Sequence, residues 1–101
     1  MMKLVLKNQE EINVNYMNNV YSFMEGAPEN ERDHVSLSIL EAGTDVNVEK
    51  MKTSINAPGN NKDFKLVYTD GEKTFEGWVI ASICEEIAYG RRNIIINLQK
   101  A

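Results

Sequence analysis

Apolar and polar residues alternate at every second position along most of the chain, and this pattern limits the folds open to it. A period of two is typical of β-strands with one buried and one solvated face. The alternating runs are residues 3–7, 11–16, 33–40, 64–68, 75–83 and 93–98. Connections of hairpin length between some of them favour antiparallel neighbours. The sequence therefore predicts an antiparallel sheet, or a small sandwich or barrel, of five to seven strands.

Two of the connections are expected to be tight hairpins. Residues 8–10 form a polar loop between the first two runs, and Asp70-Gly71 separates the fourth run from the fifth. Asp-Gly between alternating runs predicts a type I′ turn, in which both central residues have a positive φ. The fifth run is apolar on both faces, with Trp78 and Ile80 opposite Val79. We therefore expect this strand in the middle of a sheet or sandwich.

One segment has the periodicity of a helix instead of a strand. Val48, Met51 and Ile55 are spaced as i, i+3 and i+7, which predicts a short amphipathic helix over residues 46–56. Thr44 or Asp45 is placed to cap its N-terminus. The fold class is therefore α+β, mainly β, and a length of 101 residues fits a single domain over residues 1–101.

Composition and charge exclude several classes of protein. The chain has 11 Lys and Arg residues against 15 Asp and Glu, a net charge of −4, which argues against nucleic acid as a partner. Cys84 is the single cysteine, so the chain forms no intramolecular disulfide and no multi-cysteine metal site. Three of the glutamates fall within residues 24–32, which we expect to be an exposed loop.

Hydropathy predicts neither a membrane segment nor an export signal. The apolar stretches at 79–81 and 94–96 are far shorter than the ~20 residues that span a bilayer. Lys7 and the polar residues 8–11 interrupt the N-terminal apolar run before it reaches the length of a signal peptide. We expect cytoplasmic synthesis and no membrane partner, and a final location in a virion stays open.

Residue types that could perform catalysis do not form a recognisable constellation. His34, the one histidine, stands at the polar start of a strand, where we expect a surface residue. Cys84 lies in an apolar strand, where a thiol usually behaves as a small hydrophobe. Glu85 and Glu86 would point to opposite faces of a strand, and Asp70-Gly71-Glu72 lacks the further ligands of a calcium loop. We expect no catalytic, cofactor-binding or metal-binding residues, and hence no enzyme.

Two aromatic residues and one basic pair are candidates for contacts with a ligand or partner. Trp78 is either a stacking platform for a sugar or, as the face it shares with Ile80 favours, a core residue packed against the helix. Residues 89–92 predict a turn, which holds Tyr89 and the pair Arg91-Arg92. We expect these arginines to be solvated, with contact to an acidic partner as the alternative.

The order of the elements also carries a resemblance. The matching features are the opening strands 3–7 and 11–16, the serine-containing strand 35–40, the helix 45–55, the hairpin 64–79 with its Thr-Asp-Gly-Glu turn and Phe-Glu-Gly-Trp segment, and the closing strand 93–98. This layout resembles that of small structural proteins encoded in the tail and baseplate modules of phages and prophages of low-GC Gram-positive bacteria. The resemblance implies a non-enzymatic, tail-associated virion protein that assembles with copies of itself or with other tail proteins.

Unpaired strand edges suit such assembly, and we expect the first hairpin and the last strand to provide them. Two other classes of function stay open. One is a small carbohydrate- or peptide-binding module that uses exposed aromatic side chains near Trp78 and Tyr89. The other is a small enzyme, which needs a pocket where His34 or Cys84 meets a carboxylate.

Overall fold

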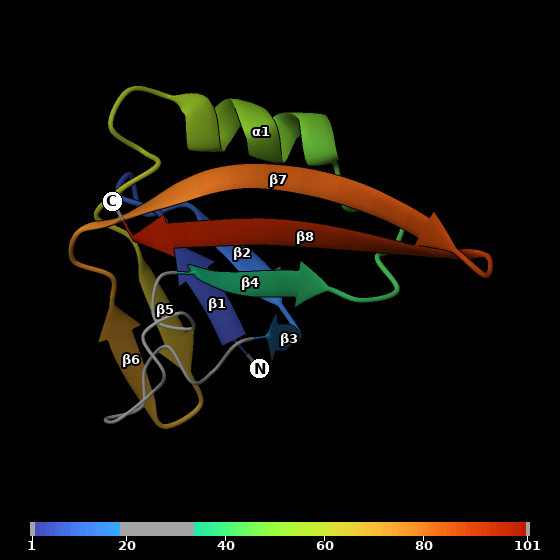
Figure 1. Ribbon diagram of the computed structural model, residues 1–101, viewed down its shortest axis with the longest axis horizontal. Helices are drawn as coiled ribbons and strands as arrows, with labels where there is room; N and C mark the ends of the chain where they lie inside the picture. Colours follow the sequence, from blue (N-terminus) through green and yellow to red (C-terminus); the bar gives the residue numbers. More distant parts are fainter. Residues whose placement is uncertain (1, 19–33, 101) are drawn as a thin grey trace.

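The computed structural model describes residues 2–18 and 34–100, which form eight strands and one helix (Figure 1). The elements are β1 (Met2–Val5), β2 (Glu11–Val14), β3 (Tyr16–Asn18), β4 (His34–Ile39), α1 (Val48–Asn56), β5 (Lys65–Tyr68), β6 (Gly71–Thr74), β7 (Trp78–Ala88) and β8 (Arg91–Lys100). The strands pair antiparallel in two four-stranded sheets. The predicted class, α+β and mainly β, is confirmed. The predicted acidic loop at residues 24–32 lies outside the described residues.

The first sheet has the strand order β2-β1-β5-β6. Its first hairpin is as predicted, with Leu4 opposite Ile12 and with Gln9 at a φ of 75° in the polar loop. In the second hairpin Tyr68 lies opposite Gly71, so the two turn residues are Thr69 and Asp70. Neither Asp70 nor Gly71 has a positive φ, and the predicted type I′ turn at Asp70-Gly71 is wrong. Gly71 serves instead as the first residue of β6.

The second sheet has the strand order β3-β4-β8-β7. The predicted strands 33–40 and 93–98 are present as β4 and as part of β8. The prediction that the last strand is an edge is wrong, because β8 lies between β4 and β7. The fifth run, predicted for the middle of a sheet, instead supplies the edge strand β7. At the start of its outer edge, Lys62 forms a bridge to Val79.

Asn15 marks the point where the chain leaves the first sheet for the second. The predicted strand 11–16 is interrupted there, since β2 ends at Val14 and β3 begins at Tyr16. The Asn15 side chain makes two hydrogen bonds to the backbone of Leu40, accepting from its N–H at 2.8 Å and donating to its C=O at 3.2 Å. These bonds hold the crossing against the end of β4, a role that periodicity alone does not reveal.

A second crossing occurs at Gly77. The predicted strand 75–83 starts too early, because β6 ends at Thr74 in the first sheet, residues 75–77 make the crossing, and β7 begins at Trp78 in the second sheet. Gly77 has a φ of 75°, a conformation that glycine adopts without the steric cost paid by other residues. Both apolar faces read from this run lie on β7, where Trp78 and Ile80 are buried and Val79 on the opposite face is half-buried.

Side chains from both sheets and the helix form one core. Its aromatic centre is Phe75, whose ring stacks on Phe64 at a centroid distance of 5.1 Å and meets Trp78 edge-on at 5.4 Å. The remaining buried members are Leu4, Leu6, Ile12, Val14, Val35, Leu37, Ile55, Leu66, Ile80, Ile96 and Leu98. Trp78 is thus a core residue, as its sequence pattern favoured.

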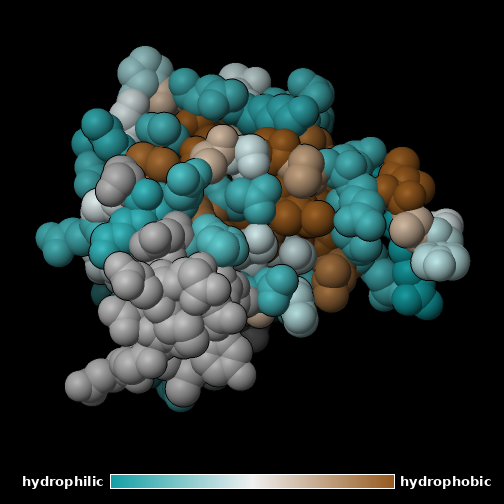
Figure 2. All heavy atoms as spheres, in the orientation of Figure 1, coloured by the Kyte–Doolittle hydropathy of each residue, from teal (hydrophilic) through white to brown (hydrophobic). Residues whose placement is uncertain are grey.

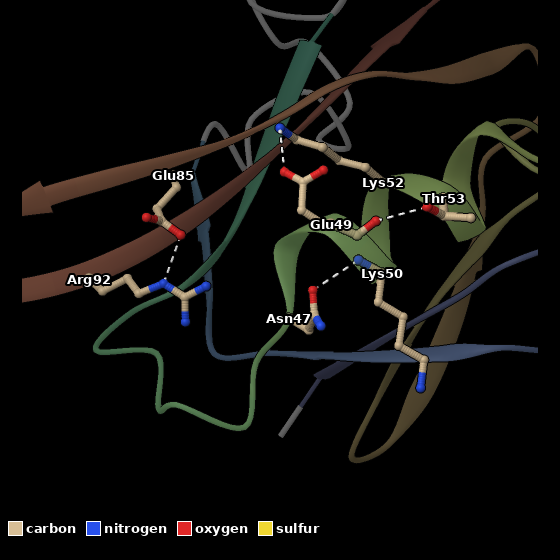
Figure 3. A network of polar contacts seen from close by, with 7 residues as sticks. All are labelled: Asn47, Glu49, Lys50, Lys52, Thr53, Glu85 and Arg92. Atoms are coloured by element: carbon tan, nitrogen blue, oxygen red, sulfur yellow. Dashed lines mark hydrogen bonds and ion pairs between the residues drawn. The ribbon is translucent and has the colours of Figure 1, made fainter.

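The helix α1 lies alongside β7 (Figure 1) and contributes Ile55 to the core. It is two residues shorter at its start than the predicted span of 46–56, and neither Thr44 nor Asp45 is the N-cap. Asn47 takes that position, because a preceding turn bonds the Val46 N–H to the Gly43 C=O at 3.1 Å. The Asn47 side chain then accepts a hydrogen bond from the Lys50 N–H at 3.0 Å (Figure 3).

Candidate functional site

The two residues considered for catalysis lie apart on the second sheet. His34 begins β4 opposite Gln99, and Cys84 lies in β7 opposite Ile95, so β8 separates them. Two strand spacings and four residues of strand length place their backbones about 16 Å apart. Both are exposed. The prediction that the Cys84 thiol behaves as a small hydrophobe within an apolar strand is wrong, because the residue is exposed on β7.

The two aromatic residues proposed for ligand contact lie at opposite ends of the same strand. Trp78 is 9% exposed at the start of β7, whereas Tyr89 follows the end of β7 and its side chain is fully exposed. An 11-residue strand spans about 33 Å. The two rings therefore do not form a shared aromatic surface.

The far ends of β7 and β8 form a hairpin arm that projects beyond the other strands (Figure 1). Ala88 pairs with Arg91, and the turn residues Tyr89 and Gly90 have φ angles of 53° and 73°. Two central residues with positive φ define the type I′ class of hairpin turn. The turn predicted at residues 89–92 is therefore present, with Arg91 and Arg92 as the first residues of β8.

Apolar side chains are exposed at the tip of this arm. Ile87 is 70% exposed, and Tyr89 stands at the turn itself. Figure 2 shows apolar surface at this end of the molecule, bordered by hydrophilic side chains. Single exposed apolar residues are ordinary, but here two stand together on an element that leaves the body of the protein.

The base of the arm is fixed to the loop that follows β4. Arg92 donates from Nε to the Glu85 carboxylate at 2.8 Å (Figure 3) and from a second guanidinium nitrogen to the Gly43 C=O at 3.1 Å. The Ala42 N–H donates to the Arg92 C=O at 2.7 Å, and the Glu41 N–H to the Asn93 side chain at 3.0 Å. An isolated two-stranded hairpin is marginally stable in water. These contacts hold the arm in a defined direction.

A cleft of about 270 Å³ lies between α1, the loop before it and β2. Its apolar lining consists of Ile12, Ile39, Val46 and Met51. Its polar lining consists of Glu10, Glu11, Asn13, Asp45, Asn47, Lys50 and Ser54. The cleft combines an apolar surface with three carboxylates and one ammonium group. It draws on β2, the end of β4 and the helix, so no single stretch of sequence indicates it.

Hydrogen bonds at the edge of this cleft favour the ionised form of Glu10. Bonds from the side chains of Ser54 and then Asn8 lower the pKa of the Glu10 carboxyl, desolvation opposes them, and the Lys50 charge adds a last, lowering effect. Asn8 Nδ2 lies 2.8 Å from Glu10 Oε1. Glu10 therefore contributes a negative charge to the cleft throughout the neutral range of pH.

Replacing Ser54 with alanine is expected to raise the pKa of Glu10 toward the ordinary value for glutamate. Because folding lowers this pKa, the group stabilises the fold above its unfolded pKa and loses that contribution as the pH falls through its folded pKa. An NMR titration of the Glu10 carboxyl carbon measures the change. Thr53→Ala is the matched control, since the Thr53 hydroxyl bonds the Glu49 C=O instead. An unchanged Glu10 titration in Ser54→Ala would contradict the account.

The described residues contain neither a metal-binding group of side chains nor a helix that could span a membrane. Within residues 2–18 and 34–100, no three His, Cys, Asp or Glu side chains are grouped so as to hold a metal ion. No helix in this part of the chain has the length and apolar character needed to cross a membrane. In comparisons with known proteins, no family model, curated protein or solved structure matches the chain.

Proposed function

We propose that this chain is a non-enzymatic structural protein that acts by self-assembly, as a tail-associated component of a phage or prophage. The observation that carries the proposal of assembly is the fixed hairpin arm with Ile87 and Tyr89 exposed near its tip. Apolar side chains on a projecting, held element are suited to burial against another protein. The assignment to a phage tail rests on the resemblance between the order of elements in this sequence and that of such proteins.

The separation of the potentially reactive residues supports a role without catalysis. His34 and Cys84 lie on strands divided by β8, and neither lines the cleft beside α1. A nucleophile needs a base within hydrogen-bond reach to be activated.

The exposed far part of the β7 edge adds a second surface that suits contact with other chains.

Size-exclusion chromatography with light scattering, run from micromolar to millimolar concentration, tests the proposal. We expect the mass to rise above the 11.5 kDa of one chain as concentration increases. The contact is small, so its affinity should lie in the weak range of protein interfaces. A mass of one chain at every concentration would contradict self-assembly.

The genes next to this one test the association with a phage tail. Neighbouring genes for tail-tape or portal proteins would support it, and unrelated metabolic genes would contradict it.

A further inference from the structure

We propose that the tip of the hairpin arm of one copy inserts into the cleft between β2 and α1 of a neighbouring copy, with Tyr89 as the inserted side chain. This inference rests on the proposed function, because it presupposes that the chain self-assembles. It names the two surfaces that meet. None of the residues that line the cleft comes from β7 or β8, so the arm of the same chain leaves it free.

The backbone conformation of Tyr89 points to a role for its side chain. A bulky residue with a φ of 53° lies in the left-handed region, which favours glycine and asparagine. Asn-Gly is the preferred pair for a type I′ turn. Tyrosine at this position is therefore unfavourable for the local backbone, and its ring is fully exposed, so it gains nothing from the core of its own chain. Local strain of this kind is common where a side chain has a function.

The size and lining of the cleft fit a single aromatic side chain. Its volume of about 270 Å³ lies below the about 300–1,000 Å³ of small-molecule sites. The ring of a tyrosine can pack on Ile12, Ile39 and Met51, while its hydroxyl needs a polar partner when it is buried. Carboxylate and amide groups at the rim of the cleft can accept that hydrogen bond.

Charge is also complementary between the two surfaces. The cleft holds the carboxylates of Glu10, Glu11 and Asp45 against the single ammonium group of Lys50. Glu11 has one exposed ion pair, with Lys3 at 3.5 Å. The tip carries Arg91, whose side chain is 68% exposed and pairs with Glu41 at 3.1 Å. An exposed ion pair of this kind contributes little to stability, so Arg91 can exchange Glu41 for an acid of the cleft.

A tip that enters a cleft on the next copy either is exchanged reciprocally between two copies, which closes a two-fold dimer, or makes head-to-tail contacts. Head-to-tail contacts extend from copy to copy, and they give a ring if the rotation closes or a filament if it does not. A contact between two tips would also stop at a dimer, but without the cleft. The tip-to-cleft and tip-to-tip geometries therefore predict different behaviour when the tip and the cleft are changed separately.

Two variants and their mixture test the inference by sedimentation velocity. Tyr89→Asn removes the ring but keeps a residue that favours the turn, so the arm stays formed. Asp45→Arg places a bulky cation at the cleft, at an exposed residue. We expect each variant alone to associate at least tenfold more weakly than the wild-type chain. Their mixture is expected to form two-chain complexes and nothing larger, because one intact tip meets one intact cleft.

Tyr16→Ser is the matched control, because Tyr16 is also an exposed tyrosine but lies in β3 and neither belongs to the arm nor lines the cleft. It should associate as the wild-type chain does. Three results would overturn the inference alone: wild-type association in Tyr89→Asn, wild-type association in Asp45→Arg, or no complex in the mixture. A wild-type chain that stays monomeric at all concentrations would overturn the proposed function and the inference together.

Discussion

Replacing Phe75 with alanine is expected to lower the free energy of unfolding by about 3–5 kcal/mol. Phe75 is 1% exposed, and its ring contacts both Phe64 and Trp78 at centroid distances of 5.1 and 5.4 Å. It lies just before the crossing at Gly77, so its ring joins residues on both sides of that crossing. A cavity at this point removes contacts from both sheets. Small domains have only about 5–15 kcal/mol of total stability, so this loss should be plain in urea denaturation followed by tryptophan fluorescence.

Phe75→Leu is the control for this experiment. Leucine keeps most of the apolar volume and loses mainly the aromatic contacts, which are worth about 0.5–1.5 kcal/mol per pair. We expect a loss of stability clearly smaller than that of Phe75→Ala. If Phe75→Ala cost less than about 1 kcal/mol, the aromatic centre would not be the packing element described above.

Replacing Asn60 with alanine is expected to cost about 1–3 kcal/mol of stability, a large effect for a polar residue outside any helix or strand. Asn60 is 3% exposed and connects two segments far apart in sequence. Its Oδ1 accepts from the Asn8 N–H at 3.0 Å, and its Nδ2 donates to the Ser54 C=O at 2.6 Å. The side chain thus ties the first hairpin loop to the last turn of α1, beside Glu10 and the cleft.

Thermal unfolding measured by circular dichroism would detect this loss. Asn56→Ala is the matched control, because Asn56 is an exposed asparagine at the end of the same helix. Surface changes of that kind usually alter stability by no more than about 0.5 kcal/mol. Equal melting temperatures for Asn60→Ala and Asn56→Ala would show that the two hydrogen bonds do not support the fold.

The periodicity of the sequence predicted most strands and the helix, but it did not predict the division of the strands between two sheets. Strands such as β4 follow a period of two over their whole length, so the pattern is sufficient to locate them. At Asn15 and Gly77 the alternation continues while the backbone changes direction. A hydrogen bond from an asparagine to a distant strand, or a positive φ at a glycine, leaves no trace in hydrophobic periodicity.

The conformational class of a turn is also not predicted by its two central residues alone. Asp70-Gly71 has the sequence of a type I′ turn but the conformation of another class, whereas Tyr89-Gly90 adopts positive φ at both positions. In the first case Tyr68 pairs with Gly71, which moves the turn one residue earlier. Pairing of the flanking strands, set by which side chains reach the core, overrides the local preference of two turn residues.

Several asparagines have structural roles that the sequence alone did not reveal. The chain has twelve of them, scattered without a motif. In the structure, several fix loops by binding backbone groups far away in the sequence: Asn15 binds Leu40, Asn60 binds Asn8 and Ser54, and Asn93 binds Glu41. These bonds shape the surroundings of the cleft and the base of the arm. Because their partners are 6 to 52 residues distant, spacing along the chain does not identify them.

Amide chemical shifts recorded over a hundredfold range of protein concentration test the central claim most directly, that the chain assembles through its hairpin arm. At 11.5 kDa the protein is well within reach of such spectra. We predict concentration-dependent shifts in two groups, residues 87–91 at the tip of the arm and residues 45–51 beside the cleft, with the remainder of both sheets unchanged. Spectra that are identical at all concentrations, or shifts confined to another edge such as β6, would contradict it.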